Sequence, residues 1–332
     1  MKICIYGIGA VGGMIAARLA AEGSSEVSAV ARGATLAALQ ANGVRLQSDE
    51  RTTHAPIRAA ASPAELGVQD VVVVSVKGPA LPAVAAGIAP LLGPETVVLS
   101  AMNGVPWWFF DGIAGPCGGM HLESVDPGGV VTAAIPASRV IGCVVHLNAG
   151  TPEPGLVLHR MGNGLIVGEP DGSASPRVQR IAQVLAGAGF DVTTSSRIQN
   201  DIWYKLWGNL TFNPVSALTG ASGDRILADP LVLAFCTAAM EEAARIGERI
   251  GCAIKETPQQ RHAVTRRLGA FRTSMLQDVE ADRPLEIDAI VGAVKEIGER
   301  VGVATPTIDA LLGLVRLLGR TRGLYPNTGS DT

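Results

Sequence analysis

A lysine and two asparagines recur at every fourth position in one segment of this chain, IQNDIWYKLWGNLTFNP. They are Lys205, Asn209 and Asn213. Four residues of an α-helix turn the chain by about 400°, so the three side chains form one slowly drifting stripe. A lysine carries a positive charge and a proton, and amides both donate and accept hydrogen bonds. Such a stripe either faces solvent at an exposed edge of the helix or lines a ligand cleft.

The residues around this stripe are mostly apolar: Ile202, Trp203, Leu206, Trp207, Leu210 and Phe212. Apolar side chains on so much of the circumference indicate a helix that packs against other elements. Asparagine is a poor helix former, which weakens the solvated-edge interpretation. Pro214 is expected to kink or end the helix just after Asn213.

A second polar group lies further along the chain, in RTSMLQDVEADRPLEID. Ser274 and Glu286 are placed between helical segments. Leu285 and Ile287 flank Glu286, a setting that suits a carboxylate buried near a cation. From the spacing alone, burial and a surface position are equally open for Glu286.

The N-terminus carries a glycine motif in the context of a strand, a turn and a helix. Residues 1–6 are predicted as a buried strand, 14–21 as a helix and 26–31 as a second strand. Between the first strand and the helix lies G-x-G-x-x-G, formed by Gly7, Ile8, Gly9, Ala10, Val11 and Gly12. This arrangement is typical of dinucleotide binding, with the pyrophosphate at the helix N-terminus. A signal peptide is the alternative, but it does not require glycines at these positions.

The end of the second strand favours a particular cofactor. Sites that prefer NAD usually carry Asp or Glu about 20 residues after the motif, to bind the ribose hydroxyls. Here Arg32 occupies that place, and a guanidinium pairs with a 2′-phosphate. A surface arginine is the alternative. The sequence favours NADPH/NADP+.

Two further strands end in polar residues. Residues 70–77 are rich in β-branched residues and end at Lys77, and 97–101 precede Asn103. Ligands in open α/β sheets bind beyond the carboxyl ends of the strands. Lys77 and Asn103 are therefore expected to contact cofactor or substrate, with simple turn positions as the alternative.

The second half of the chain changes character. From about Arg197 to Gly319 the apolar period is that of helices, with breaks at Pro214, Pro230, Pro258, Pro284 and Pro306. The predicted fold is α/β, an N-terminal Rossmann-type doubly wound sheet followed by an all-helical C-terminal domain. We expect an NADP(H)-binding domain over 1–195, a helical substrate and dimerisation domain over 196–325, and a tail over 326–332.

Composition excludes several classes of protein. The 332 residues carry a net charge of −3, so no broad basic surface for nucleic acid or membrane binding is expected. The five cysteines form no C-x-x-C pair, which indicates a reducing compartment and a cytoplasmic location. Histidine spacing fits no metal site, and no apolar stretch approaches the ~20 residues of a membrane span.

Taken together, these motifs resemble the ketopantoate reductase (2-dehydropantoate 2-reductase) family over nearly the whole chain. The resemblance rests on GIGAVG, Arg32, VSVKG, MNGV, KLWGNLTFNP and TSMLQD…EID. It implies NADPH-dependent reduction of ketopantoate to pantoate, for pantothenate and coenzyme A synthesis, at a site between the two domains. By the same resemblance Lys205 is the general acid, and Asn209, Asn213, Ser274 and Asn103 bind substrate. Asn103 and Glu286 also contact the cofactor.

Some residues depart from the family pattern. The aromatic run Trp107–Phe110 follows the Asn–Gly turn, where family members place a polar loop, and it is expected to line a more apolar pocket. A substrate asparagine known from some members falls at Gly223. Two other functions stay open: a related 2-oxo acid or 3-hydroxy acid oxidoreductase, and a non-catalytic NADPH sensor. A small-molecule substrate and a homodimer are expected.

Overall fold

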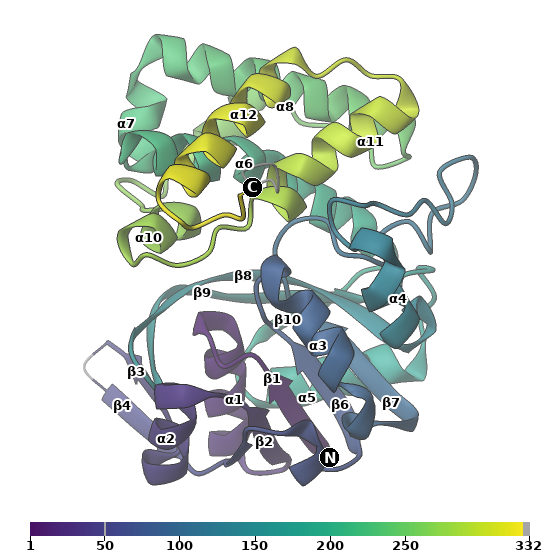
Figure 1. The fold of residues 1–332 in the computed structure, drawn as a ribbon, viewed down its shortest axis with the longest axis vertical. Helices are drawn as coiled ribbons and strands as arrows, with labels where there is room; N and C mark the ends of the chain where they lie inside the picture. The colour runs from purple at the N-terminus through teal and green to yellow at the C-terminus, as the bar shows by residue number, and fades with distance from the viewer. Residues whose placement is uncertain (50, 328–332) are drawn as a thin grey trace. The chain divides into compact units, whose positions relative to one another are not determined.

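The computed structural model describes residues 1–49 and 51–327, and the chain so described divides into two compact units (Figure 1). The first, called the sheet unit, contains residues 1–121 and 128–201. The second, called the helical unit, contains residues 122–127 and the chain from Ile202 onwards. Most of the expected tail over 326–332 lies outside the described residues.

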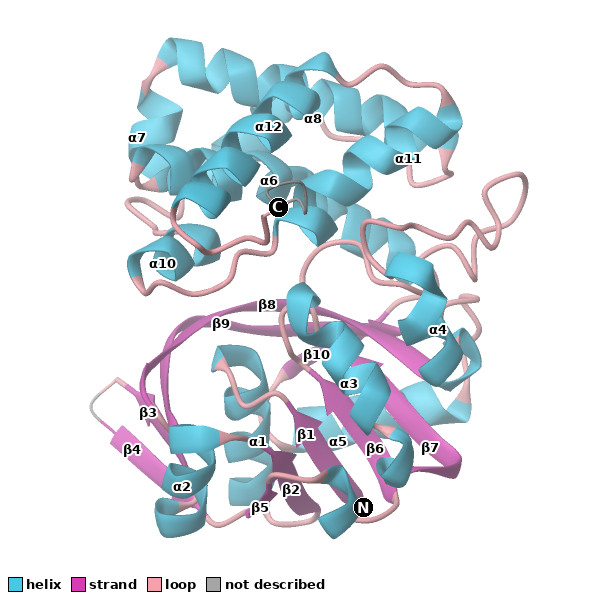
Figure 2. Cartoon of the chain, in the orientation of Figure 1, coloured by secondary structure: helices cyan, strands magenta, loops and turns pink. Residues whose placement is uncertain are grey.

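Among the described residues, the N-terminal part of the sheet unit contains seven strands and three α-helices (Figure 2). They are β1 (Lys2–Tyr6), α1 (Ala10–Glu22), β2 (Glu26–Val30), α2 (Gly33–Asn42), β3 (Val44–Ser48), β4 (Arg51–Ala55), β5 (Arg58–Ala60), β6 (Gln69–Val74), α3 (Leu81–Gly87) and β7 (Leu92–Ser100). After them come α4 (Val130–Ala134), β8 (Val140–Glu153), β9 (Leu156–Gly168), α5 (Pro176–Gly187) and β10 (Asp191–Thr194). Within the described residues the strands form one sheet in the order β4-β3-β9-β8-β7-β6-β1-β2-β5, with β10 beside β9.

Both faces of the central strands are buried. Ile3 and Ile5 of β1 belong to an apolar core that α1 and α5 share with one face of the sheet. Cys4 and Tyr6 point to the opposite face and are buried as well. Right-handed crossovers from β1 to β2 and from β6 to β7 run in opposite directions, which places α1 and α3 on opposite faces. The strands β1, β2, β6 and β7 are parallel, as the β-branched sequence runs predicted.

The sheet curls around α1. Strands β8 and β9 form a long antiparallel pair, and β9 continues the sheet to β3 and β4. Strand β4 ends at Ala55 and β5 begins at Arg58, so the two edges of the sheet lie close together. Helix α1 contacts β1 and β2 as well as β3, β4, β8 and β9. Figure 1 shows β8 and β9 arching over this helix.

The helical unit contains α6 (Ile198–Thr219, from Ile202 on), α7 (Gly223–Ala228), α8 (Pro230–Arg249), α9 (Pro258–Arg266), α10 (Ser274–Glu280), α11 (Ala293–Val301) and α12 (Pro306–Thr321). A π-helical turn spans Asp288–Gly292. Three of the predicted breaks, Pro230, Pro258 and Pro306, are the first residues of helices, where the missing N–H costs nothing. The predicted fold class, a Rossmann-type sheet followed by a helical C-terminal region, is confirmed.

Pro214 does not end its helix, so one of the two expected effects of this proline, a kink or a helix end, does not occur. Helix α6 continues through it to Thr219. Val215 and Ser216, which follow the proline, are buried, and the Ser216 hydroxyl donates a hydrogen bond to the Asn213 carbonyl oxygen (2.9 Å). Tertiary packing of this last turn outweighs the hydrogen bond that the proline removes.

The aromatic run Trp107–Phe110 does not line an open pocket, and that expectation was wrong. All four side chains are buried, the most exposed being Trp107 at 6%. Trp107 donates its indole N–H to the Ile135 carbonyl oxygen (2.9 Å). The ring of Trp108 lies against Gly142 of β8, where a Cβ atom would approach it to 2.5 Å. Burial of these large apolar surfaces stabilises the irregular segment after β7.

A short segment between the parts of the sheet unit belongs to the helical unit. The Glu296 carboxylate on α11 accepts hydrogen bonds from the backbone N–H groups of Glu123 (3.0 Å) and Ser124 (2.8 Å). Burial raises the pKa of Glu296, but the hydrogen bonds from Ser124 and Glu123 outweigh it and hold this pKa below its ordinary value. In residues 1–49 and 51–327, no helix combines the length and apolar character needed to span a bilayer.

Candidate active-site halves

The glycine motif meets β6 at very close range. The Ser75 hydroxyl, just after β6, donates a hydrogen bond to the Gly7 carbonyl oxygen (2.9 Å). A Cβ atom on Gly12 would lie 2.1 Å from that same oxygen and 2.2 Å from Ser75 Oγ. Gly7 itself has φ +108°, and a Cβ there would approach Val76 to 2.7 Å. Only glycine fits at positions 7 and 12, as the motif predicts.

Gly9 lies in the open part of the turn. It is exposed, and a Cβ atom on it would meet nothing within 4 Å. Gly9 precedes the first residue of α1 and has no side chain to cap the helix, so the first N–H groups of α1 point outward. Ile8, Ala10 and Val11 are half-buried around this turn. The arrangement suits a pyrophosphate bound by backbone N–H groups at the positive end of the helix dipole.

The turn after β1 lies at the point of the sheet from which the strand order runs in opposite directions. Strand β1 has β2 on one side and β6 on the other, and ligands of open α/β sheets bind beyond the strand ends at such a point. A pocket of about 250 Å³ opens there within the sheet unit. Its lining consists of Tyr6, Gly7, Ile8, Val30, Ala31, Arg32, Thr35, Val76, Ala80, Ala83 and Val84. The size and the mostly apolar walls fit the adenosine end of a dinucleotide.

Arg32 lies at the edge of this pocket. It is exposed and precedes the first residue of α2, and Thr35 follows in the first turn of the same helix. A phosphate beside Arg32 meets a guanidinium, a hydroxyl and a helix N-terminus together. Burial raises the pKa of Tyr6, and the charge of Arg32 opposes that rise.

Lys77 and Asn103 follow neighbouring strands. Lys77 comes three residues after β6 and precedes a 3-10 turn, Gly78–Ala80. Asn103 comes three residues after β7, whose register with β6 continues into a hydrogen bond from the Ala101 N–H to the Val74 carbonyl oxygen (2.9 Å). Both side chains are half-buried and lie at the carboxyl edge of the sheet, as predicted.

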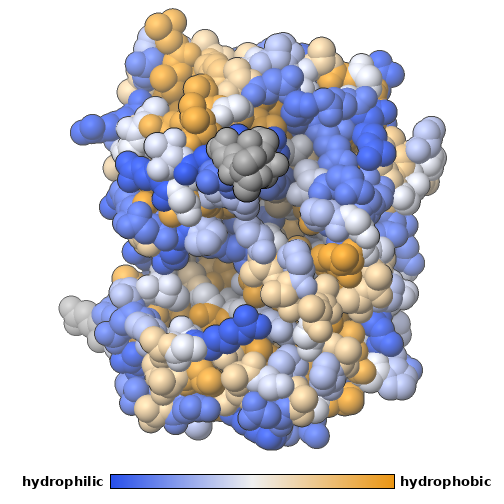
Figure 3. All heavy atoms as spheres, in the orientation of Figure 1, coloured by the Kyte–Doolittle hydropathy of each residue, from blue (hydrophilic) through white to orange (hydrophobic). Residues whose placement is uncertain are grey.

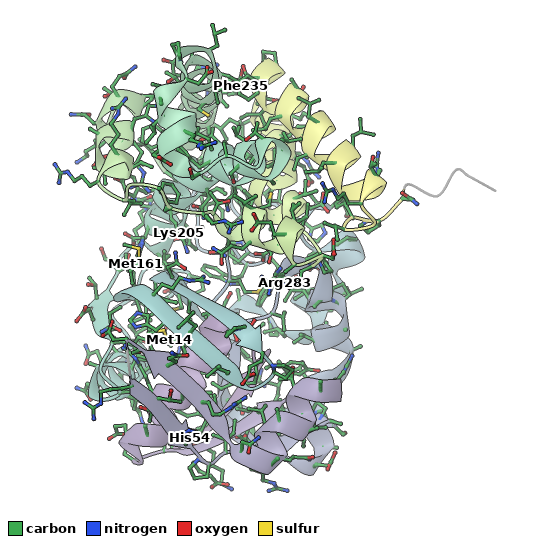
Figure 4. The ribbon with its side chains drawn as sticks, turned by 90° about the vertical axis from the view of Figure 1, so that its left-hand side faces the viewer. Met14, His54, Met161, Lys205, Phe235 and Arg283 are labelled. Atoms are coloured by element: carbon green, nitrogen blue, oxygen red, sulfur yellow. The ribbon has the colours of Figure 1, made fainter. Side chains whose placement is uncertain are left out.

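The polar stripe on α6 belongs to the helical unit. Lys205 and Asn209 are half-buried and Asn213 is 5% exposed, so the stripe is not a fully solvated edge (Figure 4 labels Lys205). Tyr204 directly precedes Lys205, and Gly208 directly precedes Asn209. Both residues contact α9. There Arg261 lies over the Tyr204 ring at 4.6 Å, and a Cβ on Gly208 would approach the Arg261 guanidinium to 3.2 Å.

Asn213 is the most informative member of the stripe. Its amide nitrogen Nδ2 is buried and has no hydrogen-bond partner in the described structure. A buried donor without a partner costs free energy, about 1–3 kcal/mol, and a functional role or a bound water or ion is a common explanation for such a group. An acceptor on a bound ligand or water would satisfy this N–H group.

Ser274 is held near the C-terminal end of this stripe. The hydroxyls of Ser216 on α6 and Thr273 are 2.5 Å apart, and Thr273 caps α10 by accepting the Leu276 N–H (3.2 Å). Ser274 is therefore the first residue of α10 and is exposed. These bonds join the segment that carries Ser274 to the turn of α6 that follows Asn213.

Glu286 is buried, with 8% of its surface exposed, so the burial interpretation of this residue is correct. Its neighbour Leu285 donates its backbone N–H to the Leu324 carbonyl oxygen (3.0 Å). The π-helical turn begins at Asp288, two residues after Glu286. The Asp288 carboxylate accepts hydrogen bonds from Arg316 and Tyr325 (2.8 Å each). Burial is the main reason why the pKa of Tyr325 rises to about 12. The C-terminal segment thus fixes the backbone that carries Glu286.

Sequence reasoning missed three residues that these halves contain: Tyr6 and Thr35 in the pocket, and Ser75 against Gly7. Ser75 lies inside the segment predicted as a strand and within the VSVKG motif, where only Lys77 was singled out. Among residues 1–49 and 51–327, no group of three or more His, Cys, Asp or Glu side chains is placed to hold a metal ion.

Comparisons with known proteins agree with this arrangement. The family model described as "Ketopantoate reductase PanE/ApbA" matches residues 3–107. The model described as "Ketopantoate reductase PanE/ApbA C terminal" matches residues 197–319. These matches cover the glycine motif, Arg32, Lys77 and Asn103 in the sheet unit, and the stripe, Ser274 and Glu286 in the second half of the chain.

Individual proteins are similar along nearly their whole length. A 2-dehydropantoate 2-reductase from Mesorhizobium japonicum is 47% identical over 98% of this chain and 100% of its own. The crystal structure of a candidate ketopantoate reductase from Ralstonia solanacearum is 59% identical with a TM-score of 0.94, covering 97% of this chain and 99% of its own. A D-mandelate dehydrogenase with NADH and anilino(oxo)acetate is 20% identical with a TM-score of 0.84, covering 98% and 100%, and shares the fold.

The Gly12→Ala substitution tests the glycine motif. The added Cβ would lie 2.1 Å from the Gly7 oxygen, so the turn must open and displace the N–H groups of α1. We expect the Kd for NADPH, measured by fluorescence titration, to rise at least ~10-fold, the effect of losing one charge-assisted hydrogen bond. Gly187→Ala is the control, because a Cβ there meets nothing within 4 Å. Unchanged NADPH binding by folded Gly12→Ala contradicts the assignment.

Proposed function

The chain belongs to the ketopantoate reductase family, and on that premise we propose that it reduces 2-dehydropantoate to pantoate with NADPH. Members of this family are oxidoreductases that act on CH–OH groups. The observation that carries the proposal for this chain is the stripe on α6, with a half-buried lysine and the buried, unpartnered amide of Asn213. The same chain carries a glycine turn suited to a dinucleotide.

The reaction needs a hydride, a proton and stabilisation of negative charge. NADPH, when bound, supplies the hydride to the keto carbon. Lys205 stabilises the charge that develops on the keto oxygen and donates the proton that completes the hydroxyl group. An ammonium group serves both purposes, and its proton is the one taken up in the overall reaction. Lys205 is therefore the proposed general acid.

The amides and the hydroxyl near Lys205 are the proposed substrate ligands. The Asn213 N–H group has no protein partner and is suited to a carboxylate or carbonyl oxygen. Asn209 lies one turn from both Lys205 and Asn213 on the same helix face. Neither amide titrates, so neither competes with Lys205 for the proton. Ser274 is the proposed substrate ligand that contributes a hydroxyl group. Glu286 is the proposed carboxylate that helps to position the cofactor.

Cofactor preference is assigned to Arg32. Asp or Glu at this position would repel a 2′-phosphate, whereas Arg32 attracts it at the edge of the 250 Å³ pocket. Thr35 offers a hydroxyl in the first turn of α2. Lys77 and Asn103, at the carboxyl edge of the sheet, are the proposed contacts for the rest of the cofactor, Asn103 also contacting the substrate.

We also propose a cytoplasmic homodimer. All five cysteines are free and buried, as suits a reducing compartment. Leu314 and Leu317 lie three residues apart on α12, with 53% and 60% of their surfaces exposed. Figure 3 shows further hydrophobic side chains gathered on this face of the helical unit. A second copy of the chain is the proposed cover for this face.

Lys205→Ala tests the general acid. NADPH oxidation at 340 nm with 2-dehydropantoate is expected to lose at least ~10³-fold in kcat, because proton donation and charge stabilisation disappear together. Binding of NADPH should not change. Lys255→Ala, which alters an exposed lysine of the same unit, should keep full activity. A fully active Lys205→Ala enzyme would remove the lysine from the mechanism, and wild-type NADPH binding without turnover would favour a sensor.

Arg32→Ala tests the cofactor preference. We expect KM for NADPH to rise ~10- to 100-fold with little change for NADH, since charge-assisted hydrogen bonds to the 2′-phosphate are lost. Arg180→Ala on α5, another exposed arginine of the sheet unit, is the control. An equal effect on NADPH and NADH would show that Arg32 does not recognise the phosphate.

Leu317→Asp tests the proposed dimer. Light scattering after size-exclusion chromatography is expected to give a dimer for the wild-type chain and a monomer for this variant, because the buried charge is unpaired at the interface. Val68→Asp, at an exposed valine of the sheet unit, should remain dimeric. A monomeric wild-type chain contradicts the proposal.

A further inference from the structure

A phenyl ring occupies the space beside Gly223 in the helical unit. Gly223 is the first residue of α7 and is buried. A Cβ atom on it would lie 2.0 Å from Phe271 Cε1, so the ring rests directly on the glycine Cα. The Gly223 N–H also donates a hydrogen bond to the Phe271 carbonyl oxygen (2.9 Å). Any residue with a side chain at position 223 would therefore collide with the Phe271 ring where it now lies.

The Phe271 ring presents a purely apolar surface. It lies 6.2 Å from the Phe212 ring with a tilt of 32°, and it packs against an apolar cluster. The buried members of that cluster are Phe212, Val215, Ile226, Leu227, Cys236 and Leu311. Phe271 itself is only half-buried. We call Phe271, Gly223 and Phe212 the phenyl wall.

The phenyl wall adjoins the proposed substrate ligands. Phe212 directly precedes Asn213, whose buried amide lacks a partner. Phe271 lies three residues before Ser274, and the Ser216–Thr273 hydrogen bond joins this segment to α6. The ring therefore lies next to the part of the chain where the substrate is proposed to bind.

We propose that the phenyl wall contacts the carbon chain of the substrate and widens the substrate class to 2-oxo acids with a branched apolar end and no terminal hydroxyl. This inference rests on the proposed reductase function. The hydroxyl of 2-dehydropantoate gains no hydrogen bond from a phenyl ring or from glycine. A site that hydrogen-bonds a substrate hydroxyl rejects the analogue without it by about 10⁴-fold or more, whereas an apolar site discriminates by about 10²-fold or less.

Two substrates that differ by one oxygen atom test the inference. In 3,3-dimethyl-2-oxobutanoate a methyl group replaces the CH₂OH group of 2-dehydropantoate. We expect wild-type kcat/KM with NADPH for the two compounds to differ by less than ~10²-fold. A wild-type preference for 2-dehydropantoate above ~10³-fold overturns the inference while leaving the proposed function intact. If neither compound is reduced although NADPH binds, the proposed function fails, and the inference with it.

Substitution of the ring assigns the effect to Phe271. Phe271→Asn introduces an amide, and we expect it to shift the kcat/KM ratio at least ~10-fold toward 2-dehydropantoate. Phe271→Leu keeps an apolar side chain and should keep the wild-type ratio. An unchanged ratio in Phe271→Asn overturns the assignment. The wild-type ratio is decisive even if this variant does not fold.

Phe235→Asn is the matched control. Phe235 on α8 packs against the same apolar cluster and is also half-buried. Figure 4 shows it well away from Lys205 within the helical unit. We expect this control to lower Tm but to leave the substrate ratio unchanged. An equal shift in the ratio would mean that general loosening of the cluster, and not the phenyl wall, determines the preference.

Discussion

The close approach of the β1–α1 turn to the end of β6 is the constraint on which the sheet unit depends. Gly7 and Gly12 leave room for only a hydrogen atom between backbone segments, and the Ser75 hydroxyl joins the two strand ends. Because β1 and β6 flank the point where the strand order reverses, this contact positions the N-terminus of α1 at the edge where Lys77 and Asn103 lie. The 250 Å³ pocket beside Arg32 opens from the same turn.

Local patterns were sufficient to predict the central strands and the polar stripe, because both depend on periodicity within one element. The edge strands were missed. In β4 four of the five residues are exposed, so no apolar alternation marks it. Strand β9 continues through Gly162, a residue type that is common in turns. In the structure Gly162 has φ +76° and the β8–β9 register shifts nearby, so the strand accommodates the glycine as an irregularity.

Aromatic residues show where the sequence is insufficient. Trp107–Phe110 lie beside a predicted site residue in the chain, yet their side chains are buried. Phe271 lies in an unremarkable polar segment, and its role emerges only from the contact with Gly223, 48 positions away. Nothing in composition or spacing distinguishes the two cases, because both depend on tertiary contacts between distant segments. The buried, unpartnered amide of Asn213 is likewise visible only in three dimensions.

The curl of the sheet around α1 also has a consequence for synthesis on the ribosome. Strand β3 pairs with β9, whose first residues follow more than a hundred positions later, so α1 stays partly uncovered until β9 has left the exit tunnel. Met14, Ile15 and Leu19, all buried in the finished protein, are meanwhile exposed to solvent or to chaperones. Long-range pairing of this kind slows folding. The N-terminal half of the nascent chain therefore needs protection from aggregation until β9 is available to pair with it.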